Sequence, residues 1–131
     1  MSQIHDGTVI VQHESPRLPD GVLAADAVAP QEFPGFRVLS YFNGPTDQLS
    51  GVSTGMVVLE PGAKPHDPHR HAEEEFMIVA DGNGEIVCGE KSYEAGPGAI
   101  MYCGGNVLHG ITNTGAAPLT FYWMKWTARG F

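Results

Sequence analysis

The chain has 131 residues, and its 15 acidic and 7 basic side chains give a formal net charge of −8 at pH 7. This length fits one domain, and so acidic a chain, with its Lys and Arg residues scattered, would be repelled by nucleic acid phosphates. It has no apolar run of about 18 residues and no cationic leader before an apolar segment, so we expect a cytoplasmic protein with no membrane or nucleic-acid partner.

Residues 1–35 are predicted to form an N-terminal strand, Thr8–Gln12, and an extended arm that packs on the rest of the chain. Four prolines between residues 14 and 35 enclose the alanine-rich segment 24–29, which is too short to be a stable helix alone. We expect one helical turn there. The arm is either a surface strap or a segment that covers the opening of the following domain or exchanges with a partner subunit.

Residues 36–131 are predicted to form a single all-β domain. Glycines and prolines divide this part into short segments rich in β-branched and aromatic residues, as strands are. Turn signals at intervals of about ten residues are typical of a sandwich or barrel. The expected strands are Phe36–Phe42, Thr54–Glu60, His69–His71, Glu75–Ala80, Gly84–Cys88, Lys91–Glu94, Ile100–Tyr102, Val107–Thr112 and Leu119–Thr127.

The segment 76–80 is apolar on both faces, so its outward side should be covered by a second sheet or by another chain. If Glu75 faces the interior, Met77 and Val79 follow it on that face. The strand phase of other candidate lining residues stays open, so each position is a pair of alternatives. These pairs are Met56 or Val57, Met101 or Tyr102, and Trp123 or Met124.

The stretch 65–75 gathers three histidines and several carboxylates. In a strand, His69 and His71 would point to one side with Cα atoms about 6.5–7 Å apart, close enough to share a cation. Glu75 keeps this parity, and Glu73 competes with it. A mixed imidazole and carboxylate set suits Fe, Mn, Ni, Co or Zn rather than calcium, and the lack of a thiolate argues against a closed structural zinc site.

Two further histidines bear on this cluster. His66 stands just before it and is interpreted as a loop residue that could carry a proton near neutral pH. His109 lies in an apolar run broken by glycines, so a second strand can bring it to the first cluster. The two cysteines, Cys88 and Cys103, lie in apolar strand-like contexts and are predicted to be small core residues.

These two segments resemble the two motifs of the cupin family. The matching positions are Gly62, His69, His71, Glu75 and Gly82 in the first motif, and Gly98, His109 and Asn113 in the second. Two departures fall in turns: six residues rather than five separate Gly62 from His69, and 104–106 reads Gly-Gly-Asn where the family has Pro-x-Gly. The extra residue shifts the loop without altering ligand parity, and Asn106 tolerates positive φ as Gly does, so neither departure disturbs the ligand pattern.

The resemblance implies a single-domain cupin jelly-roll barrel, also called a double-stranded β-helix. It also implies one divalent metal ion held by His69, His71, Glu75 and His109, and a homodimer formed through an apolar sheet. Four protein ligands on an octahedral ion leave about two positions open, which favours an enzyme.

The leading hypothesis is an oxygenase-like activity, as in the small cupins likened to quercetin dioxygenase. Arg37 and Lys125 lie inside expected strands, but no cationic anchor is evident from the sequence, so a neutral or aromatic substrate that chelates through oxygen atoms is expected. One alternative is a redox-inert metal-dependent isomerase or lyase. Another is a non-catalytic cupin that binds or senses a small ligand.

Overall fold

The computed structural model describes the backbone of residues 2–5, 8–11 and 16–130, and the side chains of residues 16–130. Its regular structure consists of strands and one 3-10 helix, η1, Ala25–Ala27. The strands are β1 Ser2–His5, β2 Thr8–Val11, β3 Gln31–Phe33, β4 Phe36–Gly44, β5 Leu49–Leu59, β6 Glu74–Asp81, β7 Gly84–Cys88, β8 Lys91–Ala95, β9 Ile100–Cys103, β10 His109–Asn113 and β11 Leu119–Ala128. Within these residues, no helix is long and apolar enough to cross a membrane.

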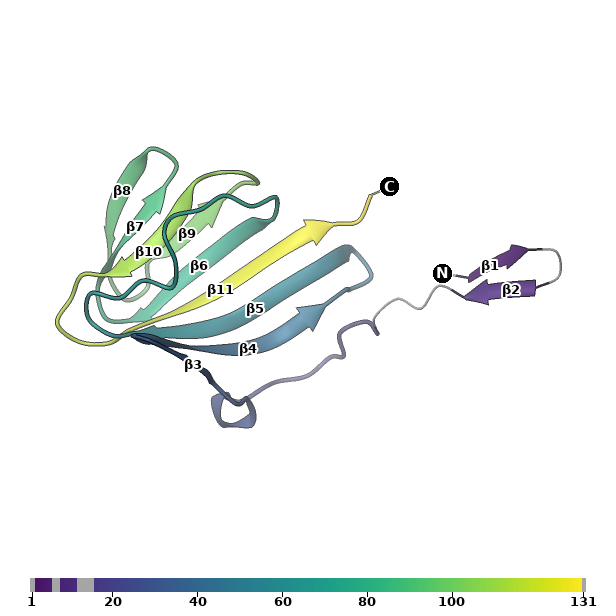
Figure 1. Cartoon of the computed structure of the whole chain (residues 1–131), viewed down its shortest axis with the longest axis horizontal. Helices are drawn as coiled ribbons and strands as arrows, with labels where there is room; N and C mark the ends of the chain where they lie inside the picture. The colour runs from purple at the N-terminus through teal and green to yellow at the C-terminus, as the bar shows by residue number, and fades with distance from the viewer. Residues whose placement is uncertain (1, 6–7, 12–15, 131) are drawn as a thin grey trace.

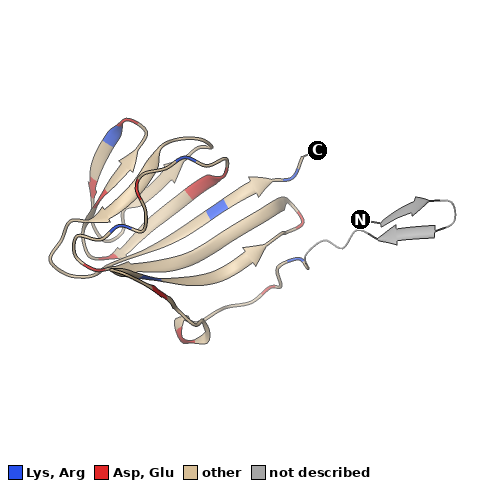
Figure 2. Cartoon of the chain, in the orientation of Figure 1, with Lys and Arg blue, Asp and Glu red and all other residues tan. Residues whose placement is uncertain are grey.

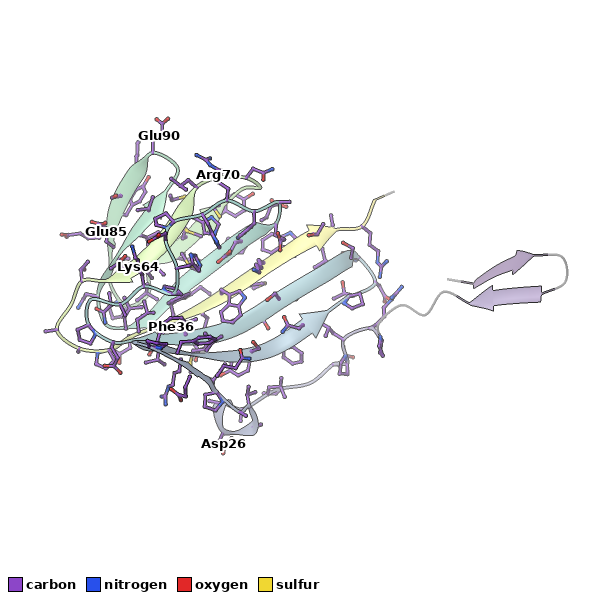
Figure 3. The ribbon with its side chains drawn as sticks, viewed as in Figure 1. Asp26, Phe36, Lys64, Arg70, Glu85 and Glu90 are labelled. Atoms are coloured by element: carbon purple, nitrogen blue, oxygen red, sulfur yellow. The ribbon has the colours of Figure 1, made fainter. Side chains whose placement is uncertain are left out.

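Two antiparallel sheets build the domain. The large sheet has the order β3-β4-β5-β11-β6-β9, and the small sheet has the order β10-β7-β8. Figure 1 shows the small sheet at one end of the large, curved one, and Glu85 and Glu90 point outward from it (Figure 3). Buried apolar residues of both sheets, such as Ile86, Ile111 and Leu119, form one core cluster. The predicted all-β jelly-roll barrel is thus confirmed.

Strand alternation places the interior face of the large sheet. Glu75, Met77 and Val79 of β6 are 7%, 3% and 1% exposed, which confirms the predicted inward side. In the neighbouring strand β11, the residues opposite these three are Lys125, Trp123 and Phe121. Because directly paired residues emerge on the same face of a sheet, these three also face the barrel interior.

The predicted strand His69–His71 is wrong. Only His69 makes a ladder contact, an isolated bridge to His109. The chain opposite turns away at once, because Asn106 adopts a φ of 61° and the amide of Val107 closes a turn onto the carbonyl of Gly104.

Several boundaries differ from expectation. The strand expected from Val107 begins at His109, and β1 and β3 were not expected. The strand expected over Thr8–Gln12 is observed as β2, whose last residue is Val11, and Gln12 lies outside the described residues. β3 lies inside the stretch assigned to the arm, and it pairs with β4 of the following domain. The division into residues 1–35 and 36–131 stays a prediction.

The part of the arm between residues 16 and 30 is mostly exposed and contains η1. Its contacts with the domain lie at the turn between β4 and β5, where the amide of Leu18 donates to the carbonyl of Pro45 at 2.9 Å. Arg17 forms an ion pair with Asp47 nearby, also at 2.9 Å. These contacts attach the arm to the rim of the large sheet, and its exchange with a partner subunit stays a prediction.

Candidate metal centre

Backbone pairing holds His69 against His109. The amide of His69 donates to the carbonyl of His109 at 2.9 Å, and the amide of His109 donates back at 3.0 Å. This bridge joins the loop after β5 to the first residue of β10, which is itself paired with β7. Because directly opposed residues place their side chains on one side, the two rings face the same space, with centroids 4.9 Å apart.

His71 and Glu75 join this pair from the following segment. The carbonyl of His71 accepts a hydrogen bond from the amide of Asn106 at 2.6 Å, which fixes the chain before it enters β6. From β6, Oε1 of Glu75 reaches Nε2 of His71 at 2.9 Å. The same oxygen lies 3.3 Å from Nε2 of His109. The four residues singled out by the sequence therefore meet in one place.

The spacing of the donor atoms fits a single ion. One ring nitrogen from each of His69, His71 and His109 lies within 4.8 Å of the other two. The rings meet edge to face, at interplanar angles of 77°, 68° and 76°. Ligands about 2.1 Å from one ion in adjacent octahedral positions are about 3 Å apart. The distances from Glu75 to His71 and His109 are of this size.

The outer nitrogens of two rings are already occupied. Nδ1 of His71 hydrogen bonds to the carbonyl of Glu73 at 3.0 Å, and Nδ1 of His109 to that of Val107 at 2.9 Å. A carbonyl only accepts, so each Nδ1 carries the proton, and in the neutral ring Nε2 presents a lone pair. Both lone pairs face the Glu75 carboxylate, an arrangement that a cation between them would stabilise.

The case for a bound cation is clearest at Nε2 of His109. His109 is 2% exposed, and among the described residues its Nε2 is the buried side-chain nitrogen or oxygen that lacks a hydrogen bond. Oε1 of Glu75 lies 3.3 Å away but makes no hydrogen bond with it, so the lone pair of the neutral ring faces a negative charge. A buried polar atom without a partner is costly. The donor set therefore fits a divalent ion such as Fe, Mn, Ni, Co or Zn.

Protonation equilibria of the metal-free cluster prepare His69 and Glu75 for an ion. Burial and the neighbouring imidazoles lower the pKa of His69 to about 4, so its ring is neutral at pH 7. Burial alone would raise the pKa of Glu75, but His109 and His71 outweigh it and lower that pKa, which keeps the carboxylate ionised. Neutral imidazoles and an ionised carboxylate are the forms that bind metals, and His69 and Glu75 are in these forms. Glu75 raises the pKa of His109, although burial opposes this, so at this residue a proton competes with an ion for Nε2.

The competing residues have other roles. The carbonyl of Glu73 orients His71, and its carboxylate lies 3.7 Å from the outer nitrogen Nδ1 rather than on the Nε2 side. Glu74 accepts a hydrogen bond from the Tyr102 hydroxyl at 2.6 Å on the outer face of the sheet. His66 is exposed and stacks on His69, with centroids 3.8 Å apart. Glu75 is thus the carboxylate that faces the histidines.

A cavity of about 170 Å³ adjoins the cluster. His69, Glu75 and His109 form one wall, and His66 lies at its side. The remaining lining is mostly apolar, which resolves two of the open strand phases in favour of Val57 and Trp123. It comprises Val38, Val57, Pro65, Met77, Gly110, Ile111, Phe121 and Trp123.

One further lining residue, Lys125 of β11, contradicts the expectation that no cationic anchor reaches the site. Lys125 has the same parity as the apolar Phe121 and Trp123, but the sequence left the phase of this strand open, so its inward position was missed. Arg37 of β4 is exposed.

Comparisons with known proteins point to one family. The family model described as a cupin domain matches residues 55–125. An RmlC-like cupin from Shewanella frigidimarina is 12% identical, with a TM-score of 0.70 over 87% of this chain and 96% of its own. A comparison with curated proteins gives no match.

Two further solved structures have an activity in their names. A sugar phosphate isomerase of the cupin superfamily from Silicibacter pomeroyi is 24% identical, with a TM-score of 0.64 over 84% of this chain and 76% of its own. The polyketide cyclase RemF from Streptomyces resistomycificus is 16% identical, with a TM-score of 0.68 over 86% of this chain and 83% of its own. At such identities, the likeness establishes the fold alone.

Proposed function

The chain belongs to the cupin family, and we propose that it is a metal-dependent enzyme acting on a small molecule. His69, His71, Glu75 and His109 are the proposed ligands of one divalent ion. The observation that carries this proposal is the buried Nε2 of His109, which has no hydrogen-bond partner among the described residues. A purely structural histidine at 2% exposure would be expected to pair both nitrogens.

We propose an oxygenase-like activity on a substrate that chelates through oxygen atoms. When bound, an ion of this kind polarises substrate oxygens and, if redox-active, exchanges electrons. The protein supplies the surroundings: Val57, Phe121 and Trp123 give the cavity apolar walls that exclude water. His66 is the proposed proton carrier, since its Nδ1 bonds to the Asp67 carbonyl at 2.8 Å and leaves Nε2 for exchange.

A redox-inert isomerase or lyase is the second candidate. It is favoured by the names of two structural neighbours, a sugar phosphate isomerase and a polyketide cyclase, neither of which is called an oxygenase. The same donor set serves Lewis-acid chemistry without change of oxidation state. A non-catalytic ligand-binding cupin is the third possibility, and the tests below separate it from both.

Metal content tests the proposed ligands. Protein purified without added ions, then loaded separately with Fe, Mn, Ni, Co or Zn, should bind about one ion per chain by elemental analysis. Glu75→Gln should reduce this occupancy strongly, because the amide brings no charge to the ligand set. Glu74→Gln is the matched control, since its carboxylate lies on the outer face against Tyr102. Equal metal loss in both variants, or no binding by the wild type, would contradict the proposal.

Turnover then assigns the reaction. Oxygen uptake by iron-loaded protein with a panel of diketones and flavonoids, lost in His109→Gln, would support the oxygenase. Turnover without oxygen uptake would favour the isomerase or lyase. One bound ion per chain without turnover on a broad panel would favour the ligand-binding protein.

We further propose that two copies pair through the outer face of β6, β9 and β11. Five large apolar side chains there are between 38% and 61% exposed: Ile78, Ile100, Tyr102, Tyr122 and Met124. They are contiguous, because Ile78 pairs with both Tyr122 and Ile100 across the strands. The small sheet does not cover this face, so the proposed cover is a second chain.

A further inference from the structure

Lys125 lies inside the barrel beside the histidine cluster. It belongs to β11, where it is paired with Glu75 of β6 on one side and Ser53 of β5 on the other. Its side chain lines the same cavity as His69 and His109. Figure 2 shows the basic segment of β11 next to the acidic start of β6. A positive charge is thus held by a rigid strand at the edge of the candidate metal centre.

Within residues 16–130, the ammonium group of Lys125 has no partner of its own. Among the described residues, no carboxylate lies within 4.0 Å of it and none of the hydrogen bonds involves it. Its cross-strand neighbour Glu75 instead approaches His71 and His109 through Oε1. One carboxylate cannot neutralise both a divalent ion and an ammonium, so this part of the cavity keeps an unbalanced positive charge.

The cavity around this charge is apolar and small. Lys125 is half-buried, and the side chains next to it on the interior face, Trp123 and Phe121, are hydrophobic. In such surroundings a cation is weakly solvated and attracts an anion strongly. A volume of about 170 Å³ admits a molecule of roughly ten heavy atoms. The ammonium of Lys125 pairs with one anionic oxygen, which leaves a second oxygen of the same molecule to face the histidine cluster.

We propose that Lys125 anchors the substrate by binding an anionic oxygen, so that the substrate is a small organic anion with a further oxygen donor directed at the histidine cluster. This substrate class replaces the neutral one expected from the sequence, and it rests on the proposed function for the role of that second oxygen. A carboxylate and the enolate of a β-diketone both have this chemistry. The charge–charge hydrogen bond would fix the orientation of the substrate between Lys125 and the three imidazoles.

A structural role for Lys125 makes a different prediction. Its aliphatic stem could simply fill space against Trp123 while the ammonium reaches water at the opening. Methionine keeps the length and apolar character of the stem and removes the charge, whereas arginine keeps the charge. Lys125→Met, Lys125→Arg and the control Lys91→Met, at an exposed position of β8, therefore separate charge from packing.

The test measures binding rather than turnover. Isothermal titration calorimetry on metal-loaded and metal-free protein would use 2-oxobutyrate, its neutral amide 2-oxobutanamide, and acetylacetone at a pH where its enolate is populated. Lys125→Met should weaken 2-oxobutyrate binding by roughly 10- to 100-fold, the loss of one hydrogen bond to a charged group. Lys125→Arg should retain part of the affinity. Lys91→Met should behave as wild type, and amide binding should not respond to Lys125→Met.

The two anions distinguish the chemical sources, since preference for one identifies a carboxylate or an enolate substrate. Metal content and thermal melting of each variant separate this proposal from the proposed function. If wild type binds no metal but Lys125→Met still selectively weakens anion binding, the anchor stands and the metal proposal fails. If wild type and Lys125→Met bind the anions equally, or wild type binds neither anion at millimolar concentration, the anchor is overturned whatever the metal content.

Discussion

Gly55 of β5 is the residue through which the fold most directly shapes the cavity. A Cβ at this position would overlap the indole of Trp123 and the backbone carbonyl oxygen of Leu39 on the neighbouring strand. Trp123 could rotate, but Leu39 belongs to the paired strand β4 and cannot yield without breaking the ladder. Gly55→Ala should therefore strain the sheet and push Trp123 toward the cavity.

The expected magnitude follows from these contacts. Overpacking a buried site costs about 1–3 kcal/mol, and displacing Trp123 also breaks its hydrogen bond from Nε1 to Ser53 Oγ at 3.1 Å, worth about 1 kcal/mol. We expect a loss of about 3 kcal/mol in the free energy of unfolding. For a chain of this length, that corresponds to a melting temperature lower by about 10 °C.

Gly51 provides the matched control in the same strand, because a Cβ there meets no atom within 4 Å. Gly51→Ala should be neutral or stabilise by about 0.5 kcal/mol through the unfolded state. Urea denaturation followed by circular dichroism gives the free energies, and tryptophan emission reports displacement of Trp123. The reasoning is refuted if Gly55→Ala melts within 2 °C of wild type, a margin of about 0.5 kcal/mol, or if Gly51→Ala loses as much stability.

Three other predictions follow from the cluster, the core and the outer face. In metal-free protein, the pKa of His69 is lowered from 6.5 to about 4, so on acidification the unfolded chain binds a proton at this ring before the folded chain does, and the free energy of unfolding falls between these two pH values. His69→Gln should flatten this part of a plot of urea stability against pH, and an unchanged slope would contradict the lowered pKa of His69. Asn113 is fully buried and bonds to the carbonyls of Leu59 and Ala117, so Asn113→Ala should cost about 2–4 kcal/mol in urea denaturation, and a cost below about 1 kcal/mol would count against its bracing role. Ile78→Glu should convert the proposed homodimer to a monomer, measured by light scattering after size-exclusion chromatography. Glu85→Lys on the small sheet, the charge-changing control, should remain a dimer, and a monomeric wild type would contradict the proposed homodimer.

Local sequence information was enough to find three of the four proposed ligands. His69, His71 and Glu75 lie within seven residues, so their convergence needs only a short irregular segment and the start of one strand. The inference survived the error about local structure, because the bridge at His69 and the hydrogen bond to the His71 carbonyl hold the segment almost as a strand would. Motif spacing then supplied His109, whose partner segment no short-range rule could identify.

The sequence by itself determined the all-β class, the inward side of β6 and the residues that could share an ion, since these follow from alternation and from the chemistry of neighbouring side chains. Only the tertiary structure decided that Glu73 orients His71 while Glu75 faces the histidines, that Nε2 of His109 is buried without a partner, and that Lys125 lies in the cavity. The physical reason is that burial and pairing across β5, β6 and β11 depend on register between segments far apart in the chain, and register is set by packing of the whole barrel rather than by any one stretch of residues.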